Sequence, residues 1–167
     1  MLGSISLDIN NNYVPIELIN VKNEQSILTV LKPLKKIRSK IQILSYLSEW
    51  CPDCINQISS LSKIYDDYKN FDLTMRIVMD YAQKKASEKF IKNNDISIPY
   101  SFGELFEKDE LLKLKTEFYK FRKTVNDNRK WGVPFHFIIF DNQISKVGII
   151  KGEFNDAEIR TYFLKNL

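Results

Sequence analysis

The sequence predicts an α/β fold in which helices flank a central mixed β-sheet. Short, mostly apolar runs at 41–47, 73–80 and 135–140 have the length and composition of buried strands. A segment with helical periodicity joins the first two runs, so we expect them to be parallel and connected by a right-handed crossover. A short turn joins the third run to a fourth at 146–150, which predicts an antiparallel hairpin.

In the first half of the chain, helices and strands are expected to alternate. We expect a loose segment to about Asn23, and then a helix from about Glu24 that Pro33 bends or ends. The strand at 41–47 follows, and a second helix begins soon after it. The apolar residues of this helix, at three- and four-residue spacing, are Ile58, Leu61, Tyr65 and Tyr68.

A long charged segment dominates the second half of the chain. Residues from about Ala82 to Arg129 are predicted to be helical and to be divided by a stretch with Pro and Gly at 98–103. After the predicted hairpin, a last helix is expected from about Asp156. The second part of the charged segment has one apolar stripe, formed by Leu111, Leu114, Phe118, Phe121 and Val125.

Length and composition are typical of a single globular domain. A chain of 167 residues, 44% of them apolar, fits one domain over residues 1–167, with a helical insertion at about 82–130. The net charge of +4 is too small to imply nucleic acid or a membrane as a partner. Neither a signal peptide nor an apolar run of membrane-spanning length is readable, so we expect a cytoplasmic protein.

Both cysteines of the chain lie in one short motif, Trp50-Cys51-Pro52-Asp53-Cys54. A secreted disulfide scaffold would distribute its cysteines along the chain. A zinc site normally needs four ligands, and the single histidine, His136, leaves too few candidates for one. We therefore interpret the pair as a reversible dithiol without a bound metal. Zinc held through this motif in an oligomer stays an alternative.

The position of the motif between a strand and a helix gives the dithiol a chemical role. Cys51 is expected to be exposed at the helix N-terminus, where free backbone N–H groups and the helix dipole favour its thiolate. Pro52 is tolerated there because the first turn has no partner for the N–H that proline lacks. Cys54 should be more buried and less acidic. Cys51 would then attack a substrate disulfide, and Cys54 would resolve the mixed disulfide.

These residues resemble the thioredoxin superfamily, and the motif WCPDC is most similar to its cytosolic thioredoxin-related branch. Gly132-Val133-Pro134, directly before the predicted strand at 135–140, resembles the loop that faces the cysteines in this family. The resemblance covers Gln42–Asp80 and Trp131–Leu167. It implies a thioredoxin-like fold, with the helical insertion placed before this loop.

The resemblance also implies roles for residues around the two motifs. Pro134 is expected to be cis and to face the cysteines. Val133 is expected to offer its backbone N–H and C=O to a substrate chain that adds like a β-strand. Gly152 is expected to line the substrate groove, Trp131 to contact substrate beside the loop, and Trp50 to pack beside the thiols.

The sequence departs from the family at the position that serves the second cysteine. Where thioredoxin has a buried carboxylate six residues before the first cysteine, this chain has Ser45, which cannot act as a base at neutral pH. The family's nearby lysine corresponds to Arg76. We expect Asp53, or water, to take the proton of Cys54, and the alternative role of Asp53 is to complement the helix dipole. His136 is expected to be a hydrogen-bonded strand residue rather than a catalytic one.

The insertion carries the charge excess of the chain. Between Tyr81 and Trp131 there are 12 Lys and Arg against 8 Asp and Glu, a net charge of +4. We favour a solvated helix face over an apolar stripe as the explanation. The alternative is a basic, aromatic rim that selects an acidic protein or an anionic small disulfide. The candidate rim cations are Lys120, Arg122, Lys123, Arg129 and Lys130.

These features predict a thiol–disulfide oxidoreductase. The expected reaction is the reduction of protein or small-molecule disulfides by the Cys51 and Cys54 dithiol, with no bound cofactor. Electrons would come from a reductase or from a low-molecular-weight thiol. The alternative is a binding module on the same fold whose dithiol senses redox state without turnover. The direction of the reaction depends on hydrogen bonds around one thiolate, which the sequence does not define.

Overall fold

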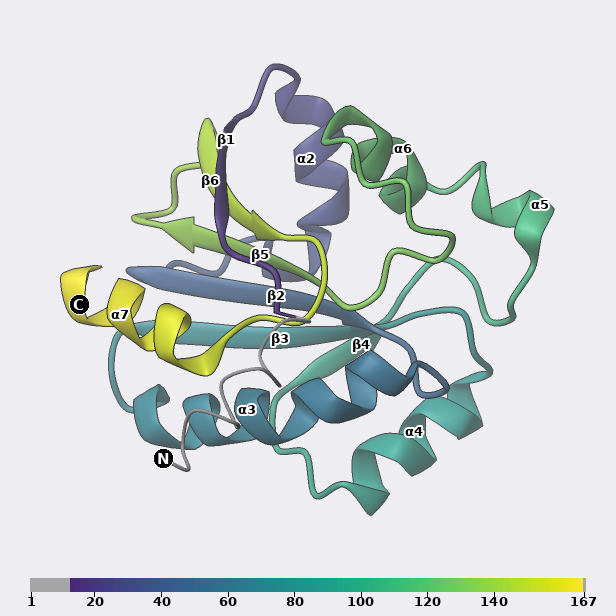
Figure 1. The fold of residues 1–167 in the computed structure, drawn as a ribbon, viewed down its shortest axis with the longest axis horizontal. Helices are drawn as coiled ribbons and strands as arrows, with labels where there is room; N and C mark the ends of the chain where they lie inside the picture. The colour runs from purple at the N-terminus through teal and green to yellow at the C-terminus, as the bar shows by residue number, and fades with distance from the viewer. Residues whose placement is uncertain (1–12, 167) are drawn as a thin grey trace, which may run out of the picture.

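The computed structural model describes residues 13–166 and places them around one six-stranded sheet (Figure 1). Residues 1–12 and 167 lie outside the described residues, and with them the first part of the expected loose segment. The order of the strands across the sheet is β1-β6-β5-β2-β3-β4. In chain order the strands are β1 (Glu17–Asn20), β2 (Ile41–Leu47), β3 (Leu73–Met79), β4 (Tyr100–Phe102), β5 (Phe135–Phe140) and β6 (Lys146–Ile150).

Both predicted strand relations are confirmed. β2 and β3 pair in parallel, and β5 and β6 pair antiparallel. β5 also pairs antiparallel with β2, in a register that sets Tyr46 opposite Phe135. The residues that follow β2 and the residues that precede β5 therefore meet at the same end of this strand pair. These are the segments that carry the two cysteines and Pro134.

Two strands were not predicted, and both lie at the edges of the sheet. β1 pairs antiparallel with β6, so the expectation of a loose segment as far as Asn23 is wrong for Glu17–Asn20. β4 pairs in parallel with β3, so the stretch at 98–103 is more than a divider between helices. β1 has four residues, most of them exposed, and β4 has three half-buried residues. Strands this short and this little buried leave almost no periodic signal in a sequence.

Helices cover both faces of the sheet, as predicted. α3, α4 and α7 lie on one side, and α2 and α6 lie on the other (Figure 1). A short 3-10 helix, η2, follows α2 and ends in the loop that leads to β2. The helices are α2 (Glu24–Val30), η2 (Lys32–Leu34), α3 (Pro52–Tyr68), α4 (Lys84–Asn93), α5 (Glu110–Lys113), α6 (Glu117–Thr124) and α7 (Asp156–Asn166).

Successive residues of β2 face these two layers in turn, and every residue of the strand is buried. Ser45 faces the α3 side, where it joins a hydrogen-bond network with that helix. Tyr46 faces the other side, where its hydroxyl donates to the Val30 carbonyl of α2 at 2.7 Å. Its ring stacks on Phe118 of α6 with the ring centroids 4.0 Å apart. Tyr46 is therefore part of the hydrophobic core.

The charged segment is less helical than its composition predicts. α4 is followed by β4 and a loop, and the remaining helix is broken into the short α5 and α6. The break comes at Thr116, whose hydroxyl caps α6 by accepting the Tyr119 N–H at 3.1 Å. Leu111 and Leu114 precede the break and are 77% and 45% exposed, so this part of the predicted stripe is wrong. The stripe is buried only from α6 onward, at Phe118, Phe121 and Val125.

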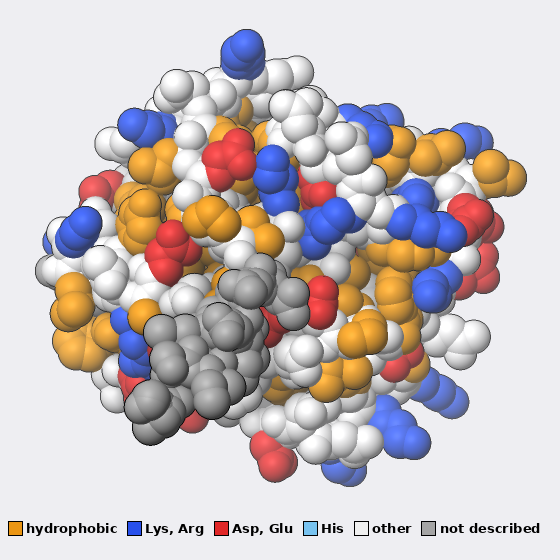
Figure 2. Space-filling model, viewed as in Figure 1, with side chains coloured by type: hydrophobic (Ala, Val, Ile, Leu, Met, Phe, Trp, Pro, Cys, Tyr) orange, Lys and Arg blue, Asp and Glu red, His pale blue; other side chains and the backbone are white. Residues whose placement is uncertain are grey.

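Hydrophobic, basic and acidic side chains are interspersed over most of the visible face of the molecule (Figure 2). None of the helices within residues 13–166 has the length and apolar character that crossing a bilayer requires.

Candidate active site

The two cysteines lie where β2 leads into α3. Cys51 is the N-cap residue of α3, and its Sγ accepts a hydrogen bond from the Cys54 backbone N–H at 3.2 Å. Pro52 is the first residue of the helix, where its missing N–H has no cost. Ser48 fixes the preceding turn, because its hydroxyl donates to the Asp80 carbonyl at 2.9 Å. The predicted strand–turn–helix arrangement is therefore present.

The two thiols differ strongly in acidity. The pKa of Cys51 is lowered to about 7, chiefly because the Cys54 side chain donates a hydrogen bond to its sulfur. Burial and the negative charge of Asp53 act in the opposite direction. Burial raises the pKa of Cys54 well above its ordinary value, and the contact with Cys51 adds to this shift. Near pH 7, a large fraction of Cys51 is therefore thiolate while Cys54 keeps its proton.

The loop before β5 lies directly against Cys51. The Val133–Pro134 peptide bond is cis, and the Cys51 Sγ lies 3.6 Å from the Val133 carbonyl oxygen. The pairing of β2 with β5 brings these two segments together. Cys51 is only 6% exposed, so the expectation of an open thiol is wrong. The carbonyl of Val133 lies against the sulfur, and Cys51 packs with the hydrophobic core.

Arg129 holds this cis-proline loop (132–134) through two backbone carbonyls. Its guanidinium donates to the Pro134 oxygen at 3.0 Å and to the Gly132 oxygen at 3.2 Å, on either side of Val133. Asp127 orients the guanidinium by accepting from its Nη2 and its Nε at 2.8 and 2.9 Å. The backbone that approaches Cys51 is therefore fixed by an ion pair whose carboxylate is buried and whose guanidinium is 33% exposed.

A second arginine, Arg122, is buried beneath the same loop. Its side chain is 0% exposed, lies 3.5 Å from an Asp127 carboxylate oxygen, and donates to the Arg129 carbonyl at 3.0 Å. Gly132 has φ +72°, and a Cβ at this position would overlap the Arg122 guanidinium. The loop therefore requires glycine here. Arg122 supports the loop from inside the protein, so its assignment to a surface rim is wrong. Arg129 is partly exposed, and its guanidinium is bonded to Asp127 and to the loop.

Three aromatic side chains meet beside the thiols. The Trp50 and Trp131 rings are 5.9 Å apart between centroids, and the Tyr81 and Trp131 rings are 5.1 Å apart. The indole N–H of Trp50 donates to the Tyr81 carbonyl at 3.0 Å. The residue before the first cysteine and the residue before the cis-proline loop are thus packed together.

A neutral polar network lies between the sheet and α3, in place of the carboxylate that thioredoxin has. The Ser45 hydroxyl lies 2.7 Å from Nδ1 of His136, and Nε2 of His136 lies 3.1 Å from the Gln57 side-chain oxygen. The same oxygen accepts the Phe154 N–H at 2.7 Å. His136 is fully buried, and burial lowers its pKa to about 3. It is therefore a neutral, hydrogen-bonded strand residue, as expected.

Arg76 does not lie near the second thiol. In the parallel pairing of β2 with β3 it stands opposite Leu44, whose side chain points to the sheet face opposite that of Ser45. α3 and its cysteine cover the Ser45 face. The prediction that Arg76 supports Cys54 is therefore wrong, because the strand register turns its side chain to the other layer.

Gly152 lies against the residue that holds the cis-proline loop. It has φ +151°, and a Cβ built there would lie 2.7 Å from the Val14 side chain and 3.9 Å from Arg129 Nη1. Gly152 is buried, with Val14 packed over it. Asp53 is exposed in the first turn of α3, where its negative charge raises the pKa of both thiols.

The buried acid Asp80 was not identified from the sequence. It follows β3 directly, and its carboxylate accepts backbone N–H groups from Tyr81 at 2.9 Å and Leu105 at 3.3 Å. The residue is 1% exposed, and burial raises its pKa to about 7. Its position in the sequence could have identified it, because an acidic residue directly follows a predicted buried strand, and that strand pairs with the strand that leads to the cysteines.

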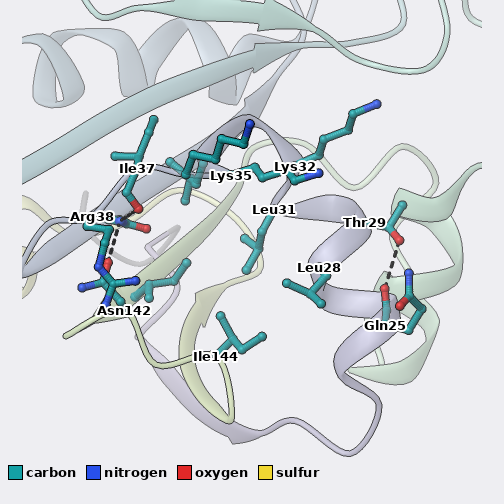
Figure 3. A pocket seen from close by; sticks show the side chains of 14 residues that line it. Gln25, Leu28, Thr29, Leu31, Lys32, Lys35, Ile37, Arg38, Asn142 and Ile144 are labelled. Carbon is teal, nitrogen blue, oxygen red and sulfur yellow. Dashed lines mark hydrogen bonds between the residues drawn. The ribbon is translucent and has the colours of Figure 1, made fainter.

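A pocket of about 570 Å³ lies away from the dithiol, between α2, η2 and the turn before β6. Figure 3 shows Leu28, Leu31 and Ile144 among its apolar side chains and Lys32 and Lys35 above them. Neither cysteine nor any cis-proline loop residue lines it. Within residues 13–166, no group of three or more His, Cys, Asp or Glu side chains is arranged to hold a metal ion.

Comparison with known proteins gives a family and a fold. The sequence profile of the family described as Thioredoxin matches residues 18–127. None of the curated protein sequences matches the chain. The chain is similar to a thioredoxin-related protein from Neisseria meningitidis serogroup B, with 19% identity over 77% of this chain and 85% of that one, at a TM-score of 0.57.

Two further solved structures share the fold. StoA from Bacillus subtilis is 17% identical, over 77% of this chain and 85% of that one, at a TM-score of 0.54. A secreted disulfide oxidoreductase from Mycobacterium tuberculosis, homologous to DsbE of E. coli, is 12% identical, over 75% of this chain and 81% of that one, at a TM-score of 0.53. Together with the family match, these structures confirm the predicted thioredoxin-like arrangement of a mixed sheet flanked by helices.

Proposed function

The chain belongs to the thioredoxin family, and from this premise we propose that it is a thiol–disulfide oxidoreductase that reduces disulfides through Cys51 and Cys54. One observation carries the proposal. A thiol with a pKa of about 7 lies 3.6 Å from the backbone of a cis-proline loop. The thiol supplies a nucleophile near neutral pH, and the loop supplies backbone on which an extended substrate chain can align.

The proposed reaction has two exchange steps. The Cys51 thiolate attacks one sulfur of the substrate disulfide, a new S–S bond forms, and the other substrate sulfur leaves with the electron pair and takes a proton. Cys54 then loses its proton and attacks the Cys51 sulfur, which releases the second substrate thiol. The substrate disulfide is reduced to two thiols, and the Cys51–Cys54 pair is oxidised to a disulfide.

The proton of Cys54 needs an acceptor in the second step. Burial keeps this thiol protonated, and the nearby network of Ser45, His136 and Gln57 is neutral. Asp53, directly or through water, is the acceptor we propose. Its charge acts on the pKa of both thiols, which supports a position close to them.

The proposed cycle is closed by an external electron donor and uses no bound cofactor. Two electrons from a reductase, or from two molecules of a low-molecular-weight thiol, would reduce the Cys51–Cys54 disulfide. The substrate is a disulfide-containing protein or small molecule, without nucleic acid or membrane as a partner. We assign the reducing direction and a cytoplasmic location from the resemblance of WCPDC to thioredoxin-related proteins of that compartment.

The low exposure of Cys51 favours a second candidate function. A thiol that is 6% exposed can be oxidised by a small oxidant yet be hard for a protein disulfide to reach. In that case the dithiol would sense redox state, and the fold would serve as a binding module without turnover.

Trapping with the Cys54→Ser variant separates the two functions. Without a resolving thiol, an oxidoreductase should accumulate a mixed disulfide on Cys51, which mass spectrometry of the non-reduced protein detects. The wild-type protein should also reduce insulin or a small aromatic disulfide with repeated turnover when a thiol donor is present. A pair that oxidises but neither turns over nor forms the mixed disulfide would support the sensor.

A further inference from the structure

Lysine side chains lie over the two tryptophans beside the dithiol. The Lys108 ammonium is 3.7 Å from the ring centroid of Trp50 and 5.6 Å from that of Trp131. The Lys113 ammonium is 4.7 Å from the Trp131 centroid. These distances are those of cation–π contacts. We call these four residues the lysine–tryptophan platform.

The platform lies beside both parts of the dithiol site. Trp50 precedes Cys51 in the chain, and Trp131 precedes the cis-proline loop. Because the two rings are in contact, a substrate whose disulfide reaches Cys51 must pass next to them. On the face shown in Figure 2, hydrophobic side chains at the right, in the region where Figure 1 places α5, are surrounded by Lys and Arg and also by Asp and Glu side chains.

The two platform lysines lack carboxylate partners among the described residues. Lys130 also lies near Trp131, but it forms an ion pair with Glu110. Lys108 and Lys113 form no ion pair within residues 13–166. Lys113 is 7% exposed and donates to the Lys130 carbonyl at 2.6 Å. Lys113 is therefore enclosed and already bonded, whereas Lys108 is exposed and only its ring contacts offset its charge. Lys108 is the platform cation that a substrate carboxylate can reach.

The α3 side of the dithiol carries acidic side chains. Asp53 is in the first turn of α3, and the pKa of Glu153 is raised by burial and by the negative charge of Asp53. An anionic substrate group is therefore repelled on the α3 side and attracted on the platform side. This asymmetry orients the substrate as well as attracting it.

We infer that the lysine–tryptophan platform selects polypeptide disulfides that carry Asp or Glu beside the reacting cysteine. The inference rests on the proposed disulfide reduction and names its substrate class. It takes up the basic, aromatic rim that the sequence left as an alternative, and it assigns the rim to residues other than Lys120 and Lys123. Lys120 pairs with Glu117 along α6, and Lys123 contacts Asn128 and Tyr119.

Two disulfide-linked peptides that differ only in having Glu or Gln next to each cysteine test the inference. With wild-type protein at low salt, kcat/KM should be roughly two- to five-fold higher for the Glu peptide, which is the effect of about one exposed ion pair, made with Lys108. The preference should shrink at about 0.5 M NaCl because salt screens it. It should disappear in Lys108→Gln and reverse in Lys108→Glu, since Lys108 is exposed and its replacement leaves the core unchanged.

Lys120→Gln is the matched control, because it removes one exposed lysine of the insertion away from the platform, and it should keep the wild-type preference. Equal kcat/KM for the two peptides, or a preference that survives in Lys108→Glu, would overturn the inference while leaving the proposed function intact. If neither peptide is reduced but both cysteines are free and oxidisable, the proposed function is wrong and the inference falls with it.

Discussion

The Cys54 side chain is the main reason why Cys51 is acidic, since its hydrogen bond to the Cys51 sulfur is the leading cause of the pKa of about 7. We expect the rate of Cys51 alkylation by iodoacetamide to rise with pH around that value in the wild-type protein. Cys54→Ala removes the donor and should move the midpoint upward. Cys54→Ser retains a hydroxyl donor and should leave it near 7. The pH dependence of alkylation, followed by intact mass, measures these midpoints, and equal midpoints in all three proteins would contradict the assignment.

Asp53 should act in opposite directions on the two half-reactions. Its charge raises the pKa of Cys51, so Asp53→Asn should increase the thiolate fraction and speed the first attack a few-fold at pH 6. The same variant should slow the release of the second substrate thiol, because the acceptor of the Cys54 proton is gone. Stopped-flow release of two thiolates from an aromatic disulfide resolves the two phases.

Asp53→Glu keeps the charge and is the control for this experiment. It should resemble the wild-type protein in both phases. If Asp53→Asn speeds the first phase and leaves the second unchanged, the carboxylate tunes the thiolate without taking the proton, and its remaining role is to complement the helix dipole.

Residues that act through local chain geometry could be predicted, whereas residues that act through tertiary contacts could not. The helix N-terminal position of Cys51 follows from a strand run, a proline and a helical period that are contiguous in the sequence. Asp80 gains its importance from burial and from its contact with Leu105, 25 residues along the chain. The role of Arg129 depends on how the loop at 132–134 folds back onto its guanidinium. Arg76 was misplaced because the side of the sheet to which a strand residue points depends on the register with its neighbour.

At the level of elements, the cis-proline loop depends on the guanidinium of Arg129. This side chain donates to carbonyls on both sides of Val133, with Asp127 holding it in place. Arg129→Lys keeps the charge but cannot make both contacts at once. We expect a rise in KM and a fall in kcat/KM of roughly 10-fold or more, because small displacements of a substrate-positioning loop are costly. Steady-state kinetics with a peptide disulfide measures this change.

Two further measurements distinguish a loss of loop positioning in Arg129→Lys from a general loss of protein stability. The pH profile of Cys51 alkylation should stay unchanged in Arg129→Lys, since the main causes of its pKa lie in α3. Arg160→Lys alters an arginine with comparable ion pairs to Asp67 and Asp156, and it should leave KM at the wild-type value. A similar loss in both variants would show that the effect is not specific to the loop.

The elements that were predicted correctly are the long, buried ones. β2, β3 and β5 have six or seven mostly buried residues each, so their apolar runs were visible in the sequence. β1 and β4 are stabilised by backbone pairing with a neighbouring strand and carry few buried side chains. The break between α5 and α6 was hidden because the apolar spacing continues across Thr116, although Leu111 and Leu114 point to solvent.

At the scale of the whole molecule, the insertion both extends the sheet and brings new side chains to the site. α4 and β4 continue beyond β3 at one edge of the sheet. The chain then returns through α5 and α6 to the cis-proline loop, which places Lys108 and Lys113 over the tryptophans. The segment is recognisable from its composition only as charged. It nevertheless supplies helices on both faces of the sheet, the arginines that support the cis-proline loop, and the lysines beside the tryptophans.

Asp80 should make the stability of the whole fold depend on pH. Its pKa is about 7 in the folded protein, against about 3.9 in an unfolded chain. Below about pH 4 the carboxyl is protonated in both states, and its contribution to stability is fully present. Between pH 4 and 7 the unfolded chain releases the proton first, so the free energy of unfolding falls as pH rises and becomes level above 7.

Asp80→Asn should remove this dependence, because an amide oxygen can still accept the Tyr81 and Leu105 N–H groups but cannot ionise. The free energy of unfolding of the variant minus that of the wild type should therefore increase by roughly 2–4 kcal/mol from pH 4 to pH 7.5. Urea unfolding at both pH values measures it, and the subtraction cancels groups such as His136, whose lowered pKa destabilises the fold in acid. A difference that stays constant with pH would show that Asp80 is ionised in the folded protein throughout this range.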